Sequence, residues 1–143
     1  MNRIVRSVSL FLVLSMLLVL PVYAEESGSR ASLFFAAYTV SIDVIDEDYF
    51  QAYFDVTGKR TMQELGATEM VIQESDNGVA WSSVRTLTTE YYPQMVCENT
   101  VGHAWWFGWT ATAGKCYRIK VTLWAKDSTG SGEKTVYSDP VWF

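Results

Sequence analysis

The sequence predicts an all-β protein, a sandwich of about seven short strands behind an N-terminal export signal. Three observations lead to this expectation. Apolar and polar residues alternate with a period of two in several segments, and turn-forming residues separate these segments. No segment has the periodicity of a helix of useful length.

Residues 1–24 are expected to be a secretory signal peptide. Arg3 and Arg6 supply the positive charge, the apolar run 7–20 follows, and Ala24 stands at the cleavage point. An uncleaved anchor is the alternative, but a spanning helix needs about 20 apolar residues and this run is shorter. We therefore expect a secreted, extracellular product without stable membrane insertion after cleavage.

Three segments follow from this cleavage: the signal peptide (1–24), a short polar linker (25–32) and one β-sandwich domain (33–143). The mature chain of 119 residues has the length of a single domain. The leader holds two of the 11 basic residues and none of the 16 acidic ones, so the mature net charge becomes −7. Such an acidic chain repels nucleic acid, and we expect no nucleic-acid partner.

The first strands are predicted over 33–44 and 49–56. In the second, four apolar residues share the face expected to be core: Phe50, Ala52, Phe54 and Val56. The alternation lapses at 57–66, where Thr61 and Glu64 have the capping-box spacing and predict one helical turn within a loop.

Five further strands are predicted beyond this loop, over 68–73, 81–87, 103–112, 117–125 and 135–143. Asn77-Gly78 predicts a tight hairpin turn with positive φ angles between the first two of them. The segment 88–102 is expected to be irregular. In 117–125, four residues share the core face: Tyr117, Ile119, Val121 and Leu123.

The final third resembles fibronectin type III domains, which are immunoglobulin-like sandwiches. The resemblance is carried by Gly114 before Tyr117 and its alternating aliphatics, by the Ser/Gly loop 128–132 and by the ending 137–141. It implies that the hydroxyl of Tyr117 bonds back to nearby backbone.

The mature chain is also similar to small uncharacterised exported domains of Gram-positive bacteria. The shared elements are Thr-Met-x-Glu-x-Gly-Ala at 61–67 and Ala-Gly-x-x-Tyr at 113–117. This family of unknown function implies a fold and no activity, because sandwich domains serve many unrelated roles.

The two cysteines, Cys97 and Cys116, are expected to form a disulfide. An even pair in an exported chain is typical of a structural bridge, with two free thiols as the alternative. The spacing is far from the C-x-x-C pattern of thioredoxin-like or zinc-ribbon sites.

No residue set predicts catalysis, so we expect a protein that is not an enzyme and needs no cofactor. His103, the single histidine, has no nucleophile motif beside it. The densest acidic cluster is a weak calcium candidate, because hard cations take oxygen ligands: Asp43, Asp46, Glu47 and Asp48. It lacks the EF-hand order, and a solvated turn between the first two strands is the better interpretation.

Aromatic residues are the candidates for ligand binding. On a strand, Trp105, Phe107 and Trp109 would share the core face and leave Trp106 toward solvent. Trp124 is off the core face of its strand, and Tyr91 and Tyr92 lie in the long loop. If these aromatic rings are exposed to solvent, their flat faces could stack on sugar rings or bind a peptide. The alternative is that loops cover them and that they belong to the core.

The leading hypothesis is an exported, non-catalytic sandwich that binds an extracellular glycan or a cell-surface protein through these aromatics. The alternative is a structural or assembly domain that self-associates through its aromatic face. A small secreted enzyme is the third and weakest interpretation, because the inventory of catalytic residues is poor.

Overall fold

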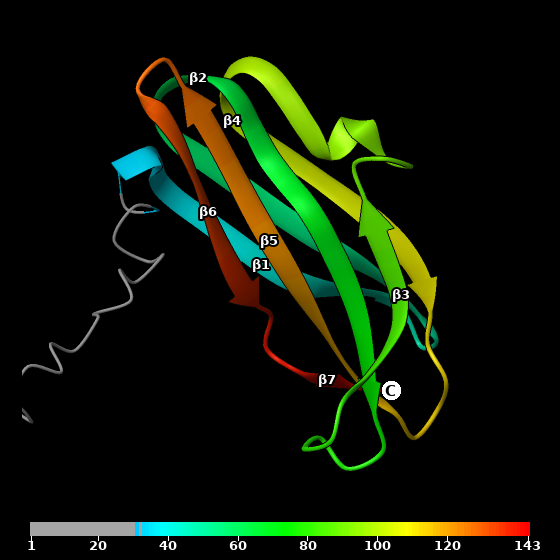
Figure 1. Ribbon diagram of the computed structural model, residues 1–143. Coiled ribbons are helices and arrows are strands. Elements are labelled where there is room, and N and C mark those ends of the chain that lie inside the picture. Colours follow the sequence, from blue (N-terminus) through cyan, green and yellow to red (C-terminus); the bar gives the residue numbers. More distant parts are fainter. Residues whose placement is uncertain (1–30, 32) are drawn as a thin grey trace, which may run out of the picture.

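The computed structural model describes Ala31 and residues 33–143, so the predicted signal peptide and most of the predicted linker lie outside the described residues. The described chain forms one seven-stranded antiparallel sheet that curls on itself (Figure 1). The strands are β1 (Phe35–Asp46), β2 (Tyr49–Ser75), β3 (Ser82–Thr88), β4 (Val96–Thr110), β5 (Cys116–Asp127), β6 (Gly130–Tyr137) and β7 (Val141–Trp142), with a 3-10 turn, η1 (Pro93–Met95), before β4. The expectation of an all-β protein is confirmed. Within these residues, no helix has the length and apolar character needed to cross a membrane.

β2 organises the sheet, because its 27 residues pair with four other strands. The first half of β2 lies between β1 and β4. The second half pairs with β5 along one edge, and with the start of β4 and then β3 along the other. β6 and β7 extend the sheet on the far side of β5 (Figure 1).

The curl is made by a bend within β2. Between two paired stretches, the residues 58–61 of β2 lie opposite the single residue Val101 of β4. Gly66 then has a φ of +156°, and a Cβ atom there would overlap the carbonyl oxygen of Met95 and lie 2.8 Å from the Cα atom of Val96. Only glycine allows this close approach of the two backbones.

The predicted loop over 57–66, with its helical turn, is therefore wrong. Met62 and Glu64 are strand residues that pair with β4, and Met62 is fully buried. The strands predicted over 49–56 and 68–73 are two parts of β2. Ladder hydrogen bonds to β4 and β5 satisfy this backbone in an extended conformation, which overrides the local capping signal.

The core lies inside the curl, between the two halves of the sheet. The core faces predicted for 49–56 and 117–125 are confirmed, since each residue expected on them has 0% exposure: Phe50, Ala52, Phe54, Val56, Tyr117, Ile119, Val121 and Leu123. Phe50 of the first half contacts Tyr117 of β5 across the core, with ring centroids 5.3 Å apart. Phe143 at the end of the chain contacts both rings.

Tyr117 bonds back to the backbone as the resemblance implied. Its hydroxyl accepts a 2.9 Å hydrogen bond from the N–H of Thr112, in the loop before β5. The same hydroxyl donates a 2.6 Å hydrogen bond to Oε2 of Glu74 near the end of β2. This one side chain therefore connects β2, β5 and the loop between β4 and β5.

The turn at Asn77-Gly78 is wider than the predicted tight hairpin. Six residues, 76–81, separate β2 from β3, and of the two predicted residues only Gly78 has a positive φ, +72°. The Oδ1 atom of Asn77 accepts hydrogen bonds of 2.9 Å from the N–H groups of Val79 and Ala80. Asn77 thus shapes the loop through its side chain instead of through a left-handed backbone.

The predicted disulfide between Cys97 and Cys116 is wrong. Both are free thiols, Cys97 half-buried and Cys116 buried. Cys97 lies opposite Leu65 and Cys116 lies opposite Ser75, which places them ten residues apart along β2. That is roughly 30 Å of strand, whereas a disulfide requires Cα atoms within about 7 Å of each other.

Candidate functional site

The candidate residues from the sequence do not come together into one site. Tyr91 is 76% exposed in the loop between β3 and β4. Tyr92 is half-buried against Trp105 and Phe107, with centroid distances of 5.8 and 5.6 Å, and its hydroxyl accepts a 3.0 Å hydrogen bond from Arg85. Tyr92 therefore closes one side of the core and offers little surface to a ligand.

The two candidate tryptophans lie on different halves of the sheet. Trp124 is on β5 opposite Gly66, and its indole N–H donates a 2.7 Å hydrogen bond to Glu64. This contact leaves Trp124 half-buried. Trp106 is on β4 opposite Tyr53 and is 51% exposed. Of the two indoles, Trp106 is the one that presents more of its surface to solvent.

The outward position of Trp106 follows from the alternation along β4. Trp105, Phe107 and Trp109 are partly buried and pack against the core, as predicted. Trp106 points to the opposite face, between Ala104 and Gly108, which share that face. Because both neighbours are small, they leave room beside the indole, and on the Gly108 side a ring from β2 occupies that room.

Two tyrosines of β2 belong to the same outward surface as Trp106. Tyr53 is directly opposite Trp106, and Tyr49 lies two residues before Gln51 on the same face. A Cβ atom built on Gly108 would overlap the hydroxyl oxygen of Tyr49 and lie 2.7 Å from its Cζ atom. The Tyr49 ring therefore lies directly over the backbone of Gly108. We call Tyr49, Tyr53 and Trp106 the aromatic face.

Carboxylates and hydroxyls border the aromatic face. The hydroxyl of Tyr53 donates a 3.2 Å hydrogen bond to Asp55, and the hydroxyl of Ser41 donates one of 2.8 Å to Asp43. Partial burial raises the pKa of Tyr53, and the nearby charges of Asp55 and Asp43 raise it further. Tyr53 is consequently protonated at neutral pH, and the border presents carboxylate oxygens as hydrogen-bond acceptors.

The calcium candidates are divided between this border and a turn. Asp43 pairs opposite Gln51 within the sheet, whereas Glu47 and Asp48 form the turn between β1 and β2. Oδ1 of Asp46 accepts a 2.8 Å hydrogen bond from the N–H of Glu47. In the part of the chain that the structure describes, no three acidic, histidine or cysteine side chains are grouped so that they could hold a metal ion.

His103 and Cys116 are turned away from the aromatic face. His103 is half-buried on the inner side of β4, its Nε2 atom lies 2.9 Å from the carbonyl oxygen of Gln94, and its ring contacts Phe54. Cys116 is buried, and burial raises the pKa of its thiol. The aromatic face itself offers flat rings, hydroxyls and carboxylates, which suit binding.

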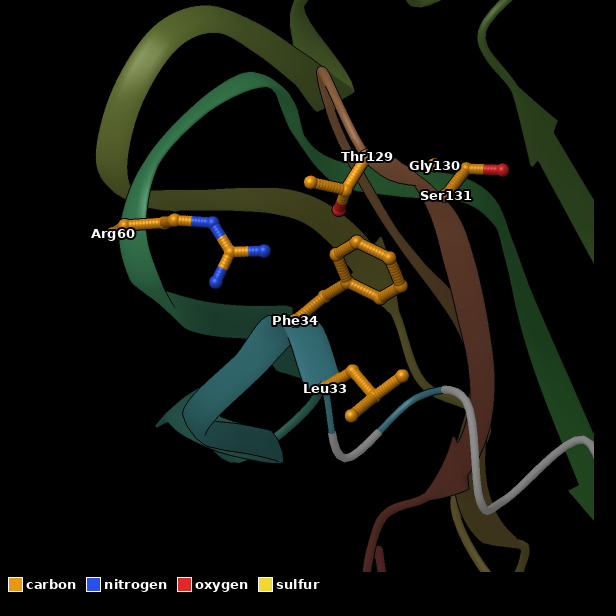
Figure 2. A pocket seen from close by; sticks show the side chains of 6 residues that line it. All are labelled: Leu33, Phe34, Arg60, Thr129, Gly130 and Ser131. Atoms are coloured by element: carbon orange, nitrogen blue, oxygen red, sulfur yellow. The ribbon is translucent and has the colours of Figure 1, made fainter.

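A hollow of about 680 Å³ lies where the chain before β1 meets the hairpin between β5 and β6 (Figure 2). It is lined by Leu33, Phe34, Arg60, Thr129, Gly130 and Ser131. Nε of Arg60 donates a 2.6 Å hydrogen bond to the buried Asp127, which forms an ion pair with the same guanidinium. The charge of Arg60 is thereby compensated by Asp127, so the hollow is a poorer candidate than the aromatic face.

The expectation that Trp106 points toward solvent is confirmed, whereas Tyr49, Tyr53 and Asp55 are not among the binding candidates expected from the sequence. A signal for them was present: in the segment 49–56 they occupy the face opposite the buried residues. The alternation that located Trp106 also places these two tyrosines on the solvent side of their strand, where both are half-buried.

No protein-family model matches this sequence, and no curated protein is similar to it. Among solved structures, the chain is similar to Spo0M, a sporulation control protein from Bacillus subtilis, with a TM-score of 0.37 and 10% sequence identity. The similarity covers 72% of this chain and 49% of that protein, so this chain spans about half the length of Spo0M.

Proposed function

We propose that this protein is a non-catalytic carbohydrate-binding domain that holds its ligand on the aromatic face. The observation that carries the proposal is the 51% exposure of Trp106 directly opposite Tyr53, with small residues on either side of the indole. Flat aromatic rings stack on the apolar faces of sugars, and their rigidity keeps the entropic cost of binding low. An exposed indole on the outward face of a sheet is a typical anchor of this kind.

The border of the aromatic face supports a sugar ligand over an apolar one. Asp55 and Asp43 hold carboxylate oxygens beside the rings, and both are already positioned by hydroxyl donors. Sugar hydroxyls donate well to ionised carboxylates, and such bonds are about twice as strong as neutral ones. The border is negatively charged, which favours a neutral saccharide over an acidic one at this face.

Export and a fibronectin type III-like arrangement complete the proposal. Export is supported by the charge, apolar run and cleavage point of the segment 1–24. The fibronectin-like arrangement is supported by the hydrogen bond from the N–H of Thr112 to the hydroxyl of Tyr117, which is a feature of those sandwiches. An exported domain would meet glycans outside the cell.

A glycan array probed with protein expressed from the full-length chain tests this proposal. We expect Trp106→Ala to weaken binding of the selected neutral glycan about tenfold or more, because truncating a central tryptophan typically costs ~2 kcal/mol or more. Trp142→Ala is the matched control, since Trp142 is similarly exposed, at 56%, but lies on β7 away from the aromatic face.

Three results would contradict the proposal. If no glycan on the array binds, the proposed carbohydrate ligand is contradicted. If Trp106→Ala and Trp142→Ala lose the same affinity for the glycan, the aromatic face has no specific role in binding. A stable dimer in solution that protects Trp106 from a water-soluble fluorescence quencher would favour self-association at this face instead.

A further inference from the structure

Arg118 lies on the outward side of β5 between aromatic rings from two other segments. Its Cζ atom is 4.4 Å from the ring centroid of Trp81 and 4.6 Å from that of Tyr137. Trp81 directly precedes β3, and Tyr137 ends β6, so the rings reach Arg118 from opposite sides of β5. Contacts of a guanidinium with two rings at these distances restrict its position and orientation.

Arg118 also contacts an amide. Its Nε atom donates a 2.7 Å hydrogen bond to Oε1 of Gln73, the residue opposite it on β2. This bond uses the Nε side of the guanidinium and leaves the two terminal nitrogens for other acceptors. Two coplanar N–H groups on a fixed guanidinium match the two oxygens of a carboxylate.

Lys120 adds a second positive charge to the same face. It is two residues along β5 from Arg118 and lies directly opposite Tyr137. The ion pairs of the described residues engage Arg60, Lys115 and Lys126 with carboxylates, and neither Arg118 nor Lys120 is among them. Within residues 33–143, Lys59, Arg85 and Lys134 also have no ion pair, but Arg118 and Lys120 lie two residues apart on one face of a single strand.

We propose that Arg118 and Lys120 form a second binding site, which takes the carboxylate groups of an acidic polysaccharide. The guanidinium would hold one carboxylate through its terminal nitrogens, and Lys120 would attract the next charge along the polymer. This site is separate from the aromatic face, because Arg118 lies on the half of the sheet formed by β2, β5 and β6. It is independent of the neutral-glycan proposal.

The position of β5 favours a polysaccharide over an acidic peptide. β5 pairs with β2 along one side and with β6 and β7 along the other, so within the described sheet it offers no open edge to which a peptide strand could add. Recognition must therefore use side chains alone. Thr122 and Thr135 lie opposite each other on the outward face beyond Lys120 and supply hydroxyls for sugar contacts.

Titration of protein expressed from the full-length chain with oligogalacturonate tests the site, with fully methyl-esterified oligogalacturonate as the neutral probe. We expect binding of the acid form only, and weaker binding at higher salt. Arg118→Gln should reduce affinity about tenfold or more, and Lys120→Gln by a smaller factor. Lys126→Gln is the matched control, because Lys126 lies on the same face of β5 but is paired with Glu64 at 3.9 Å.

A spectroscopic measurement on the unsubstituted protein tests the site even if Arg118→Gln does not fold. In the NMR spectrum, oligogalacturonate should shift the Trp81 indole resonance and leave that of Trp106 in place, and Trp106→Ala should bind it unchanged. Equal binding of the methyl ester, equal losses for the Arg118 and Lys126 variants, or tighter binding of polyglutamate than of oligogalacturonate would overturn the proposal.

Discussion

The hydroxyl of Tyr117 lies 2.6 Å from a carboxylate oxygen of Glu74 and 2.9 Å from the backbone nitrogen of Thr112. The Tyr117 ring is fully buried and contacts Phe50 and Phe143. Burial makes the largest contribution to raising the pKa of the Tyr117 hydroxyl, and the hydrogen bond from this hydroxyl to Glu74 raises the pKa further. The hydroxyl therefore stays protonated at neutral pH and holds the end of β2 to the loop before β5.

Tyr117→Phe should lower the free energy of unfolding by about 1–3 kcal/mol, because it leaves a partly buried acceptor and donor without their partner. Urea unfolding followed by tryptophan fluorescence measures this change. Tyr91→Phe, at a residue 76% exposed, is the control and should change stability by less than about 0.5 kcal/mol. Equal effects of the two substitutions would contradict the role of the Tyr117 hydroxyl.

Both cysteines should be found as thiols in protein purified without reductant. Denatured, unreduced protein should take up two equivalents of a thiol reagent, because the strand register separates Cys97 from Cys116. In the folded protein we expect Cys97 to react first, since Cys116 is buried and its burial raises the thiol pKa. Mass spectrometry that detects a peptide linked through both residues would refute this arrangement.

We expect the ionisation of Asp127 to make the free energy of unfolding depend on pH in the acidic range. Hydrogen bonds from the side chain and backbone of Thr129, followed by the contact with Arg60, lower the pKa of Asp127. Because the pKa of Asp127 is lower in the folded state, its ionised carboxylate stabilises the protein at pH values above the ordinary carboxyl pKa of ~3.9. This stabilisation is lost as the pH falls through the pKa of Asp127 in the folded protein.

Asp127→Asn is therefore expected to be less stable than the unsubstituted protein from pH 7 to about 5, and the difference should shrink below about pH 4. Urea unfolding at a series of pH values measures both curves. Asp139→Asn, at an exposed residue, serves as the control and should follow the unsubstituted protein. A gap for Asp127→Asn that is constant down to about pH 2 would exclude its ionised carboxylate as the cause.

Strand faces could be predicted from the sequence because burial leaves a period-two pattern in each strand. The pattern predicts the core side for Phe50, Phe54, Tyr117 and Leu123, and all four are fully buried. Trp106 was placed toward solvent by the same pattern. These predictions depend only on residues close together in the chain, where the alternation acts.

The long-range arrangement could not be predicted in this way. The continuity of β2 through 57–66 depends on pairing with β4 and β5, and the bend depends on the bulge opposite Val101. The separation of Cys97 from Cys116 follows from that register, which no local pattern in either cysteine segment reveals. The neighbourhood of Tyr53 and Trp106 is likewise a product of pairing between strands that are far apart in sequence.

Gly108 should act on the aromatic face through Tyr49. A methyl group on Gly108 would overlap the hydroxyl oxygen of Tyr49 and lie only 2.7 Å from its Cζ atom. Gly108→Ala must therefore displace the ring, and we expect losses in both unfolding free energy and neutral-glycan affinity. Gly102→Ala, on the same strand, is the control, since the nearest atom to its Cβ would be 3.8 Å away.

A double-mutant cycle separates this steric effect from a general cost of alanine at Gly108. In a Tyr49→Ala background the ring is gone, so Gly108→Ala should cost much less than it does in the unsubstituted protein. Contacting residues typically show coupling energies of about 0.5–3 kcal/mol in such cycles. The same cost of Gly108→Ala in both backgrounds, by urea unfolding, would show that Tyr49 does not depend on Gly108 for its place on the sheet.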